Sequence, residues 1–173
     1  MRKDQEKQEN EPRWSNAIGV IGENESLSPH PPPKAEPAHK QLLQNIAGSK
    51  ILLVEDNPVN QLVAESILKQ AHLLVETVWN GKEAVDLLRN NPKHEAPAYS
   101  AVLMDVEMPV LDGYMATELI RKEAYLRDIP IIAMTAHAFK RDKDRCIKAG
   151  MNDYIAKPID ERELLTVLTK WIN

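Results

Sequence analysis

The sequence predicts an α/β domain whose five-stranded parallel sheet is covered by helices on both faces, in the doubly wound (βα)5 arrangement. One observation leads to this fold class. Five short apolar runs alternate with five stretches of helical periodicity from residue 50 to the end of the chain. Strands that are joined through helices run parallel, and right-handed crossovers place the helices on both faces. Ligand chemistry in such sheets collects at the carboxyl ends of the strands.

The first strand is the run KILLVED, which begins at Lys50. The helix after it starts at Asn57 and Pro58, because asparagine suits the cap and proline suits the first helical position. This helix extends to residue 70. Six of its residues recur at helical spacing and form one mostly apolar stripe: Val59, Leu62, Val63, Ser66, Ile67 and Gln70.

The remaining elements continue this alternation. The expected strands cover residues 73–78, 101–104, 129–135 and 152–156. The expected helices are a short one that opens at Asn80–Gly81, one over 113–126, one over 139–149 that Gly150 stops, and a last one. Asp160 and Glu163 form a capping box for the last helix, which carries Leu164, Leu165, Leu168 and Trp171.

Residues 1–48 differ in composition from the rest of the chain. They contain half of the 12 prolines, including Pro31–Pro32–Pro33, and show no sustained periodicity. Such a stretch buries too little apolar surface to offset the entropy of ordering it. We therefore expect a disordered tail or linker over 1–48, with one or two helical turns within 38–46, and a folded domain over 49–173.

Composition excludes several classes of protein. A formal net charge of −4 argues against nucleic acid as the main partner. The single cysteine, Cys146, rules out an internal disulfide and fits a reducing compartment. No apolar run approaches the roughly 18 residues of a membrane span. The N-terminus lacks the apolar core of a signal peptide. The sequence therefore predicts a cytoplasmic protein with neither a membrane nor a nucleic-acid partner.

Polar side chains gather at the predicted carboxyl ends of four strands. Glu55 and Asp56 follow the first strand, Asp105 ends the third, Thr135 ends the fourth, and Lys157 follows the fifth. Three clustered carboxylates raise one another's pKa unless a cation joins them. Oxygen ligands without histidine or cysteine favour Mg²⁺ over zinc. A carboxylate nucleophile, a divalent metal, a lysine and a hydroxyl form an arrangement for handling a phosphoryl group.

Four motifs, in order along the chain, carry a resemblance to a known family. KILLVEDNPVNQ, DVEMPVLDG, MTAHA and YIAKPI resemble the receiver domain of two-component response regulators, most of all the receivers of hybrid histidine kinases. The resemblance covers residues 49–173. Thr135 and Lys157 lie 30 and 52 residues after Asp105, as the family pattern requires. The resemblance implies the flavodoxin-like form of the doubly wound sheet.

The resemblance also implies the chemistry of the site. Asp105 would attack a phosphohistidine on a partner protein and form an acyl phosphate. Asp56 and Asp105 would hold Mg²⁺, with Glu55 acting directly or through water and with the main-chain carbonyl of Glu107 completing the protein's ligands. His137 and Glu107 are candidates for setting how fast the acyl phosphate hydrolyses.

The resemblance implies a switch as well. Lys157 would pair with Asp105 at rest and with a phosphoryl oxygen afterwards, and Thr135 would hydrogen-bond the phosphoryl group. Tyr154 would then turn inward and reshape the face formed by helix 139–149, strand 152–156 and the last helix. That face is also a candidate homodimer contact.

The implied partner is a histidine kinase or a histidine phosphotransfer protein. By resemblance to receivers that dock a four-helix-bundle partner, Asn60, Gln61 and Ala64 are candidates for choosing the phosphodonor. In the enzymatic sense such a receiver catalyses only its own phosphorylation and dephosphorylation.

Three hypotheses about the chain stay open at this point. It is a stand-alone receiver, or the C-terminal receiver of a hybrid sensor histidine kinase with residues 1–48 as linker. The third is a Mg²⁺-dependent aspartyl-phosphate phosphatase, in which Glu107, two residues beyond the nucleophile, would be the acid–base group. The receiver motifs favour the first two. The last helix reaches Trp171, so we expect no output domain after it.

Overall fold

A computed structural model describes residues 43–90, 98–136 and 140–172, all within the unit Ala35–Asn173. Five parallel strands form one sheet in the order β2-β1-β3-β4-β5. They are β1 (Lys50–Val54), β2 (Leu74–Val78), β3 (Ala101–Asp105), β4 (Ile131–Thr135) and β5 (Asp153–Ala156). The predicted doubly wound sheet is confirmed. Because the strand order reverses between β1 and β3, the crevice for ligands lies at their carboxyl ends.

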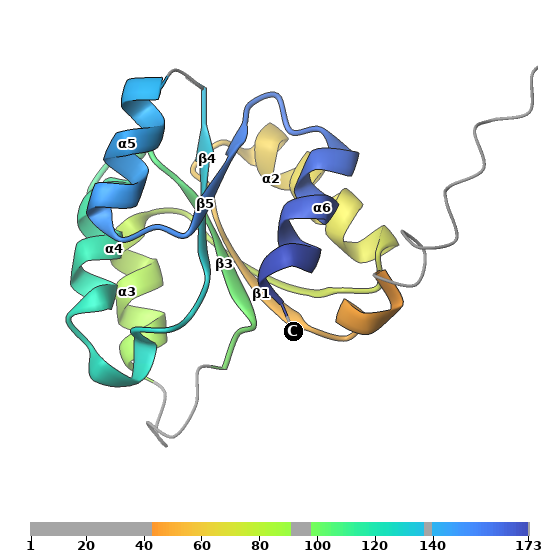
Figure 1. Cartoon of the computed structure of the whole chain (residues 1–173), viewed down its shortest axis with the longest axis horizontal. Helices are drawn as coiled ribbons and strands as arrows, with labels where there is room; N and C mark the ends of the chain where they lie inside the picture. The colour runs from red at the N-terminus through yellow and green to blue at the C-terminus, as the bar shows by residue number, and fades with distance from the viewer. Residues whose placement is uncertain (1–42, 91–97, 137–139, 173) are drawn as a thin grey trace, which may run out of the picture. The chain divides into compact units, whose positions relative to one another are not determined.

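Helices cover both faces of the sheet (Figure 1). One face carries α2 (Pro58–Gln70) and α6 (Glu161–Trp171), and the other carries α3 (Gly81–Arg89), α4 (Gly113–Arg121) and α5 (Lys140–Ala149). Side chains cap the first turns of four helices, each accepting a hydrogen bond from a backbone N–H: Asn57, Asn80, Asp112 and Asp160. These caps turn the chain back at the carboxyl edge of the sheet, beside the crevice.

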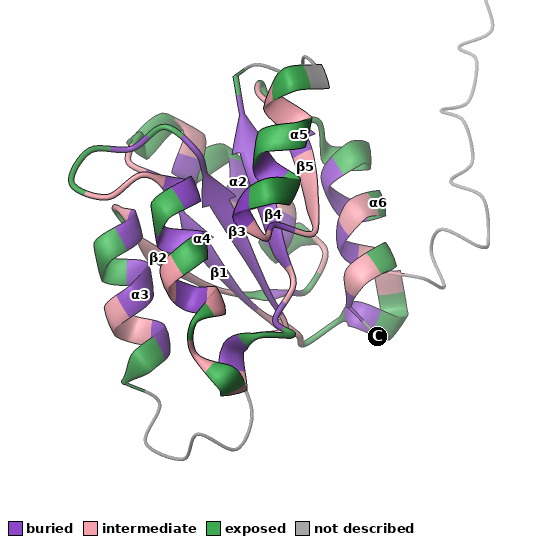
Figure 2. Ribbon diagram, turned by 60° about the vertical axis from the view of Figure 1, so that its left-hand side comes forward, coloured by how far each residue is buried: buried purple, intermediate pink, exposed green. Residues whose placement is uncertain are grey.

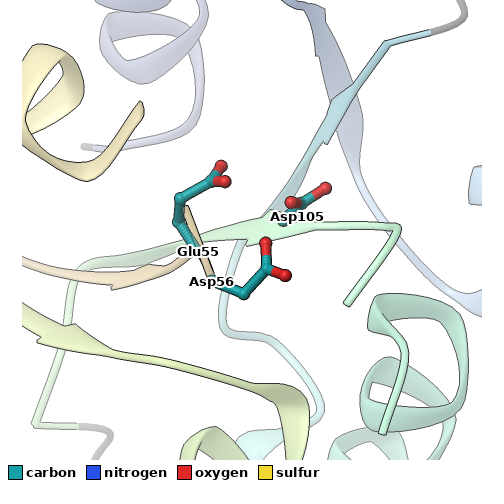
Figure 3. Close-up of side chains that lie close together, drawn as sticks. All are labelled: Glu55, Asp56 and Asp105. Carbon is teal, nitrogen blue, oxygen red and sulfur yellow. The ribbon is translucent and has the colours of Figure 1, made fainter. Parts of the chain in front are cut away.

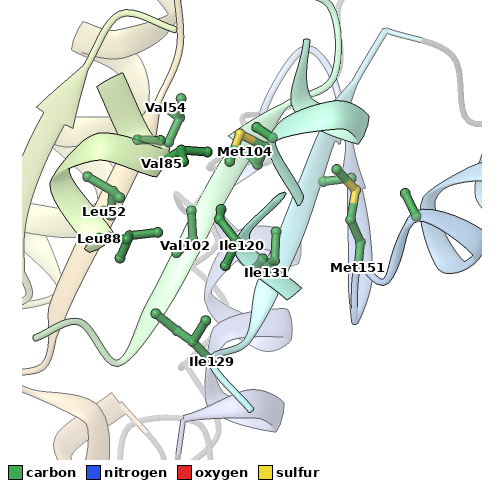
Figure 4. Close-up of a cluster of buried hydrophobic side chains, with 14 of the residues drawn as sticks. Leu52, Val54, Val85, Leu88, Val102, Met104, Ile120, Ile129, Ile131 and Met151 are labelled. Atoms are coloured by element: carbon green, nitrogen blue, oxygen red, sulfur yellow. The ribbon is translucent and has the colours of Figure 1, made fainter. Parts of the chain in front are cut away.

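A hydrophobic core lies on each face of the sheet. The central strands β1, β3 and β4 are buried almost throughout (Figure 2), which explains why their sequences are continuously apolar. One core includes Leu52, Val54, Val85, Leu88, Val102, Met104, Ile120 and Ile131 (Figure 4). The other includes Ile51, Leu53, Leu68, Leu103, Ile132, Leu164 and Leu168. Alternate strand residues thus contribute to opposite cores.

The buried face of α2 is not its apolar stripe. Val59, Leu62 and Val63 are 67%, 69% and 44% exposed. The residues that α2 buries are Gln61, Ala64 and Leu68. An apolar strip of surface therefore runs along the outside of this helix, starting at its N-terminal turn.

The predicted helix over 113–126 is wrong at its C-terminal end, because α4 stops at Arg121 and a 3₁₀ turn, η1 (Ala124–Leu126), follows. Between them Glu123 has an extended backbone. The Arg121 guanidinium donates hydrogen bonds to the carbonyls of Leu126 and Gly150 and to the Asn152 side chain. The chain has to leave the helix to bring the Leu126 carbonyl to this arginine.

The folded part of the chain begins earlier than the predicted boundary at residue 49. Residues 43–46 are helical, and Ile46 is 1% exposed within the core beneath α2 and α6. Burial of Ile46, with Leu43 packed against the same core, ties the turn to the domain. The rest of the predicted tail, residues 1–42, lies outside the described residues. Within the described ranges, no helix combines the length and the apolar character needed to cross a bilayer.

Candidate functional site

Three carboxylates meet at the carboxyl ends of the two central strands (Figure 3). Glu55 and Asp56 follow β1, and Asp105 is the last residue of the neighbouring β3. One carboxylate oxygen from each lies within 4.8 Å of the others. Glu55 is fully buried, Asp105 is 3% exposed, and Asp56 is half-buried. The predicted clustering of these acids is therefore present.

Lys157 joins two of these acids. Its Nζ lies 2.7 Å from Asp105 Oδ2 and 2.7 Å from Glu55 Oε2. Its backbone N–H donates to the carbonyl of Thr135, and its peptide bond to Pro158 is cis. Thr135 is buried at the end of β4, one position beyond the residue that pairs with Asp105. The structure brings the predicted lysine and hydroxyl to the acids, and their roles stay predictions.

The backbone of the loop after β3 and of the first residue of α4, residues 106–113, lies against Asp105. The Glu107 N–H donates to Asp105 Oδ1 at 3.1 Å, while the Glu107 side chain is exposed. Val110 has a φ of 70°, and a hydrogen bond closes the turn across it. Such a conformation costs a β-branched residue about 1–3 kcal/mol. A Cβ on Gly113 would lie 2.1 Å from the Asp105 carbonyl oxygen, so only glycine lets α4 start against the end of β3.

Burial dominates the electrostatics of Asp105. It raises the pKa of this carboxyl to about 6, although the hydrogen bonds from Lys157 and from the Glu107 N–H act in the opposite direction. Burial also disfavours the Lys157 ammonium, but hydrogen bonds to Asp105 and then Glu55 outweigh it and raise the pKa of Lys157. The Lys157 ammonium therefore stays protonated, but its single positive charge does not balance three carboxylates.

The residues fit a divalent cation. Three carboxylates and one ammonium leave two negative charges at the site when all are ionised. Lys157 Nζ, at 2.7 Å, is the one partner that the described residues give the buried Glu55 Oε2. Asp56 likewise has no hydrogen bond or ion pair within the described ranges. Oxygen-only ligands suit Mg²⁺, which Glu55, Asp56 and Asp105 would hold; the Glu107 carbonyl as a further ligand stays a prediction.

The first turn of α2 also belongs to the site, which the sequence did not reveal. Asn60 Nδ2 donates to Glu55 Oε1 at 3.0 Å, and Gln61 Nε2 donates to the Glu55 carbonyl at 2.6 Å. Gln61 is 8% exposed and Ala64 is fully buried. The expectation that these two residues choose the phosphodonor is therefore wrong, because they face the sheet. The signal in the sequence is a pair of amide side chains, Asn60 and Gln61, that follow the strand-end acid Glu55 by five and six residues.

Tyr154 lies on β5, the edge strand that leads to Lys157. It pairs with Ala133 on β4 and is half-buried, and Lys143 Nζ from α5 lies 4.3 Å from its ring centroid. The predicted inward turn of this ring stays a prediction. His137, the other residue considered on this side, lies outside the described residues.

Comparison with known proteins agrees with the geometry. Residues 51–169 match the family model described as the response regulator receiver domain. Two-component system protein A of Emericella nidulans is 44% identical over 136 residues, which cover 76% of this chain and 19% of that protein. Sensor histidine kinase GacS of Pseudomonas protegens is 38% identical over 125 residues, covering 70% and 13%. This chain thus spans about a fifth or less of the length of these curated relatives.

Two solved structures are similar over nearly the whole of their own chains. The receiver domain of sensor histidine kinase PA1611 from Pseudomonas aeruginosa PAO1 is 48% identical with a TM-score of 0.65, over 73% of this chain and 98% of that one. That domain has a magnesium ion coordinated in its active-site cleft. The Saccharomyces cerevisiae Ssk1 receiver, solved with the histidine phosphotransfer signaling protein Ypd1, is 28% identical with a TM-score of 0.65, over 73% and 90%.

Proposed function

Because this chain belongs to the response regulator receiver domain family of two-component phosphorelay systems, we propose that Asp105 accepts a phosphoryl group from a phosphohistidine on a partner protein. The observation that carries the proposal is the contact of Lys157 Nζ with Asp105 Oδ2 at 2.7 Å, at the crevice edge of a buried strand. A cation at this place is ready to pair with phosphoryl oxygens when the Asp105 carboxylate gives up its charge to the new bond.

The chain's own residues orient the transfer and offset part of its charge. A carboxylate oxygen of Asp105 forms a bond to phosphorus while the bond from phosphorus to the histidine nitrogen breaks, and that bond's electron pair stays on the nitrogen. The Glu107 N–H fixes the orientation of the Asp105 carboxylate, and Lys157 offsets the phosphoryl charge. Thr135 would donate its hydroxyl to a phosphoryl oxygen. Bound Mg²⁺ would supply further charge neutralisation on those oxygens.

The partner's surface contact follows from the exposed stripe of α2. Val59, Leu62 and Val63 are exposed and begin one turn from the acids, so a protein that brings a histidine to Asp105 covers them. We propose a histidine kinase or a histidine phosphotransfer protein as this partner, since the related Ssk1 receiver was solved with Ypd1. Apolar contact along this helix would give the encounter its affinity.

Other predictions about the chain extend this proposal. We propose that it catalyses only its own phosphorylation and dephosphorylation, whether as a stand-alone receiver or within a hybrid kinase. A homodimer through α5, β5 and α6 is supported by Ile147, an apolar side chain that is 56% exposed on α5. The cytoplasmic location of the protein stays a prediction.

The test is intact-mass analysis after incubation with acetyl phosphate and MgCl₂, and separately with a phosphorylated phosphotransfer protein. We expect one phosphoryl adduct that hydroxylamine removes and that EDTA prevents. Asp105→Asn should abolish it, whereas Asp144→Asn, on the exposed side of α5, should keep it. An adduct that persists in Asp105→Asn would reject Asp105 as the acceptor. No adduct from either donor would reject phosphoryl acceptance itself.

A further inference from the structure

We infer that Asn60 is a positioning residue that holds the Glu55 carboxylate in the orientation needed for Mg²⁺ binding. The inference rests on the proposed function, because it concerns the metal site of the same reaction. Asn60 lies in the first turn of α2 and is half-buried, and its side chain points back to the acids instead of outward with Val59. Its Nδ2 donates to Glu55 Oε1 at 3.0 Å.

The α2 turn holds Glu55 at both ends. Oε1 accepts a second hydrogen bond from the backbone N–H of Asn57, at 3.3 Å, and the main-chain carbonyl of Glu55 accepts one from Gln61 at 2.6 Å. The torsion that rotates a glutamate carboxylate is intrinsically broad. Two donors on one oxygen therefore fix an orientation that the side chain would not keep by itself.

This orientation leaves the other oxygen for a cation. Oε2 is buried, and the ion pair with Lys157 is its one polar contact among the described residues. One carboxylate oxygen of Glu55 lies within 4.8 Å of an oxygen of Asp56 and of an oxygen of Asp105. Carboxylates that bind metals are usually hydrogen-bonded in turn, and loss of such an outer partner typically costs about 10–100-fold in metal affinity. Asn60 supplies the side-chain hydrogen bond of this kind to Glu55.

The chemical character of Asn60 suits the task. An amide donates a hydrogen bond without adding charge, so it orients Glu55 and leaves the net negative charge of the site intact. A lysine or arginine at this position would also hold the carboxylate, but its positive charge would repel a divalent cation. Lys157 already places one ammonium against Glu55. A neutral donor on the opposite oxygen is therefore the arrangement that favours metal binding.

The experiment compares Mg²⁺ affinity by isothermal titration calorimetry in four proteins, each comprising residues 1–173. Asn60→Leu keeps the shape of the side chain without its donor, and we expect about a 10-fold weaker affinity. Asn60→Gln restores a donor and should recover part of this loss. Ser66→Ala is the matched control, because it removes from the same helix an exposed side-chain hydrogen bond that Ser66 accepts from Gln70. The control should bind Mg²⁺ like the wild type.

A second measurement shows whether Asn60 acts through Glu55. The ¹³C resonance of the Glu55 side-chain carboxyl in the metal-free protein should shift in Asn60→Leu and stay in place in Ser66→Ala. An unchanged Mg²⁺ affinity or an unchanged Glu55 resonance in Asn60→Leu overturns the inference while the proposed phosphoacceptor stands. Absence of Mg²⁺ binding in the wild type overturns the metal site itself, and the inference with it.

Discussion

Asp105→Asn should make the metal-free protein more stable at neutral pH, although it removes the proposed phosphoacceptor. Asp105 is 3% exposed, and burial raises its pKa from 3.8 to about 6. A carboxyl whose pKa is higher in the folded state contributes its full stability below the unfolded value and loses it as the pH rises through the folded value. Above about pH 6 the ionised side chain therefore weakens the fold, and a neutral amide of the same shape avoids this.

The structure bounds the size of the gain. A shift from 3.8 to about 6 corresponds to about 3 kcal/mol, at 1.36 kcal/mol per pKa unit. An amide makes a weaker hydrogen bond with Lys157 than a carboxylate does, so part of this gain is lost. Lys157 keeps its ion pair with Glu55 in the variant. We therefore expect a net gain of about 1–2 kcal/mol, which raises Tm by roughly 4–8 °C in a domain of this size.

The assay is urea and thermal unfolding in EDTA between pH 4 and pH 8. The advantage of Asp105→Asn should be largest above pH 6 and should shrink toward zero near pH 4, where the wild-type carboxyl is protonated in both states. Asp144→Asn, at an exposed position, controls for the substitution itself. Added MgCl₂ should stabilise the wild type more than the variant. A variant that is less stable at pH 7, or a gain independent of pH, would refute the reasoning.

Three further substitutions test other parts of the structure. Lys157→Met leaves two buried acids without their cation and should cost about 3–5 kcal/mol at pH 7 in urea unfolding. An equal loss at pH 5, where Asp105 is largely protonated, would contradict this. Gly113→Ala places a Cβ 2.1 Å from the Asp105 carbonyl oxygen. It should lower the free energy of unfolding by about 3 kcal/mol and slow adduct formation. Unchanged stability would contradict this. Ile46→Ala should cost about 2–4 kcal/mol, whereas a residue of a flexible tail would cost nothing.

Local chemistry made most of the fold predictable. Continuous apolar runs predicted central strands, and cap residues such as Asn57 and Asp160 predicted where helices start, because both signals act within a few residues. The end of α4 was not predictable in this way. Arg121 has ordinary helix propensity, but its guanidinium is bound by carbonyls that lie 5 and 29 residues further along the chain. Ile46 likewise lies in a short segment of mixed apolar and polar residues, and its place in the core depends on contacts with residues far along the chain.

The α2 helix shows why the acids could be predicted and their support could not. Strand-end carboxylates are recognisable because the carboxyl ends of parallel strands share one edge. Hydrophobicity, however, would bury Leu62 before Gln61, and the structure does the reverse. The main-chain carbonyl of Glu55 is buried and needs a hydrogen-bond donor. Leaving this carbonyl without a donor costs more free energy of folding than leaving a leucine exposed. The rotation of α2 that buries Ala64 and Leu68 in the core also meets this hydrogen-bonding need, and it exposes the apolar stripe beside the acids.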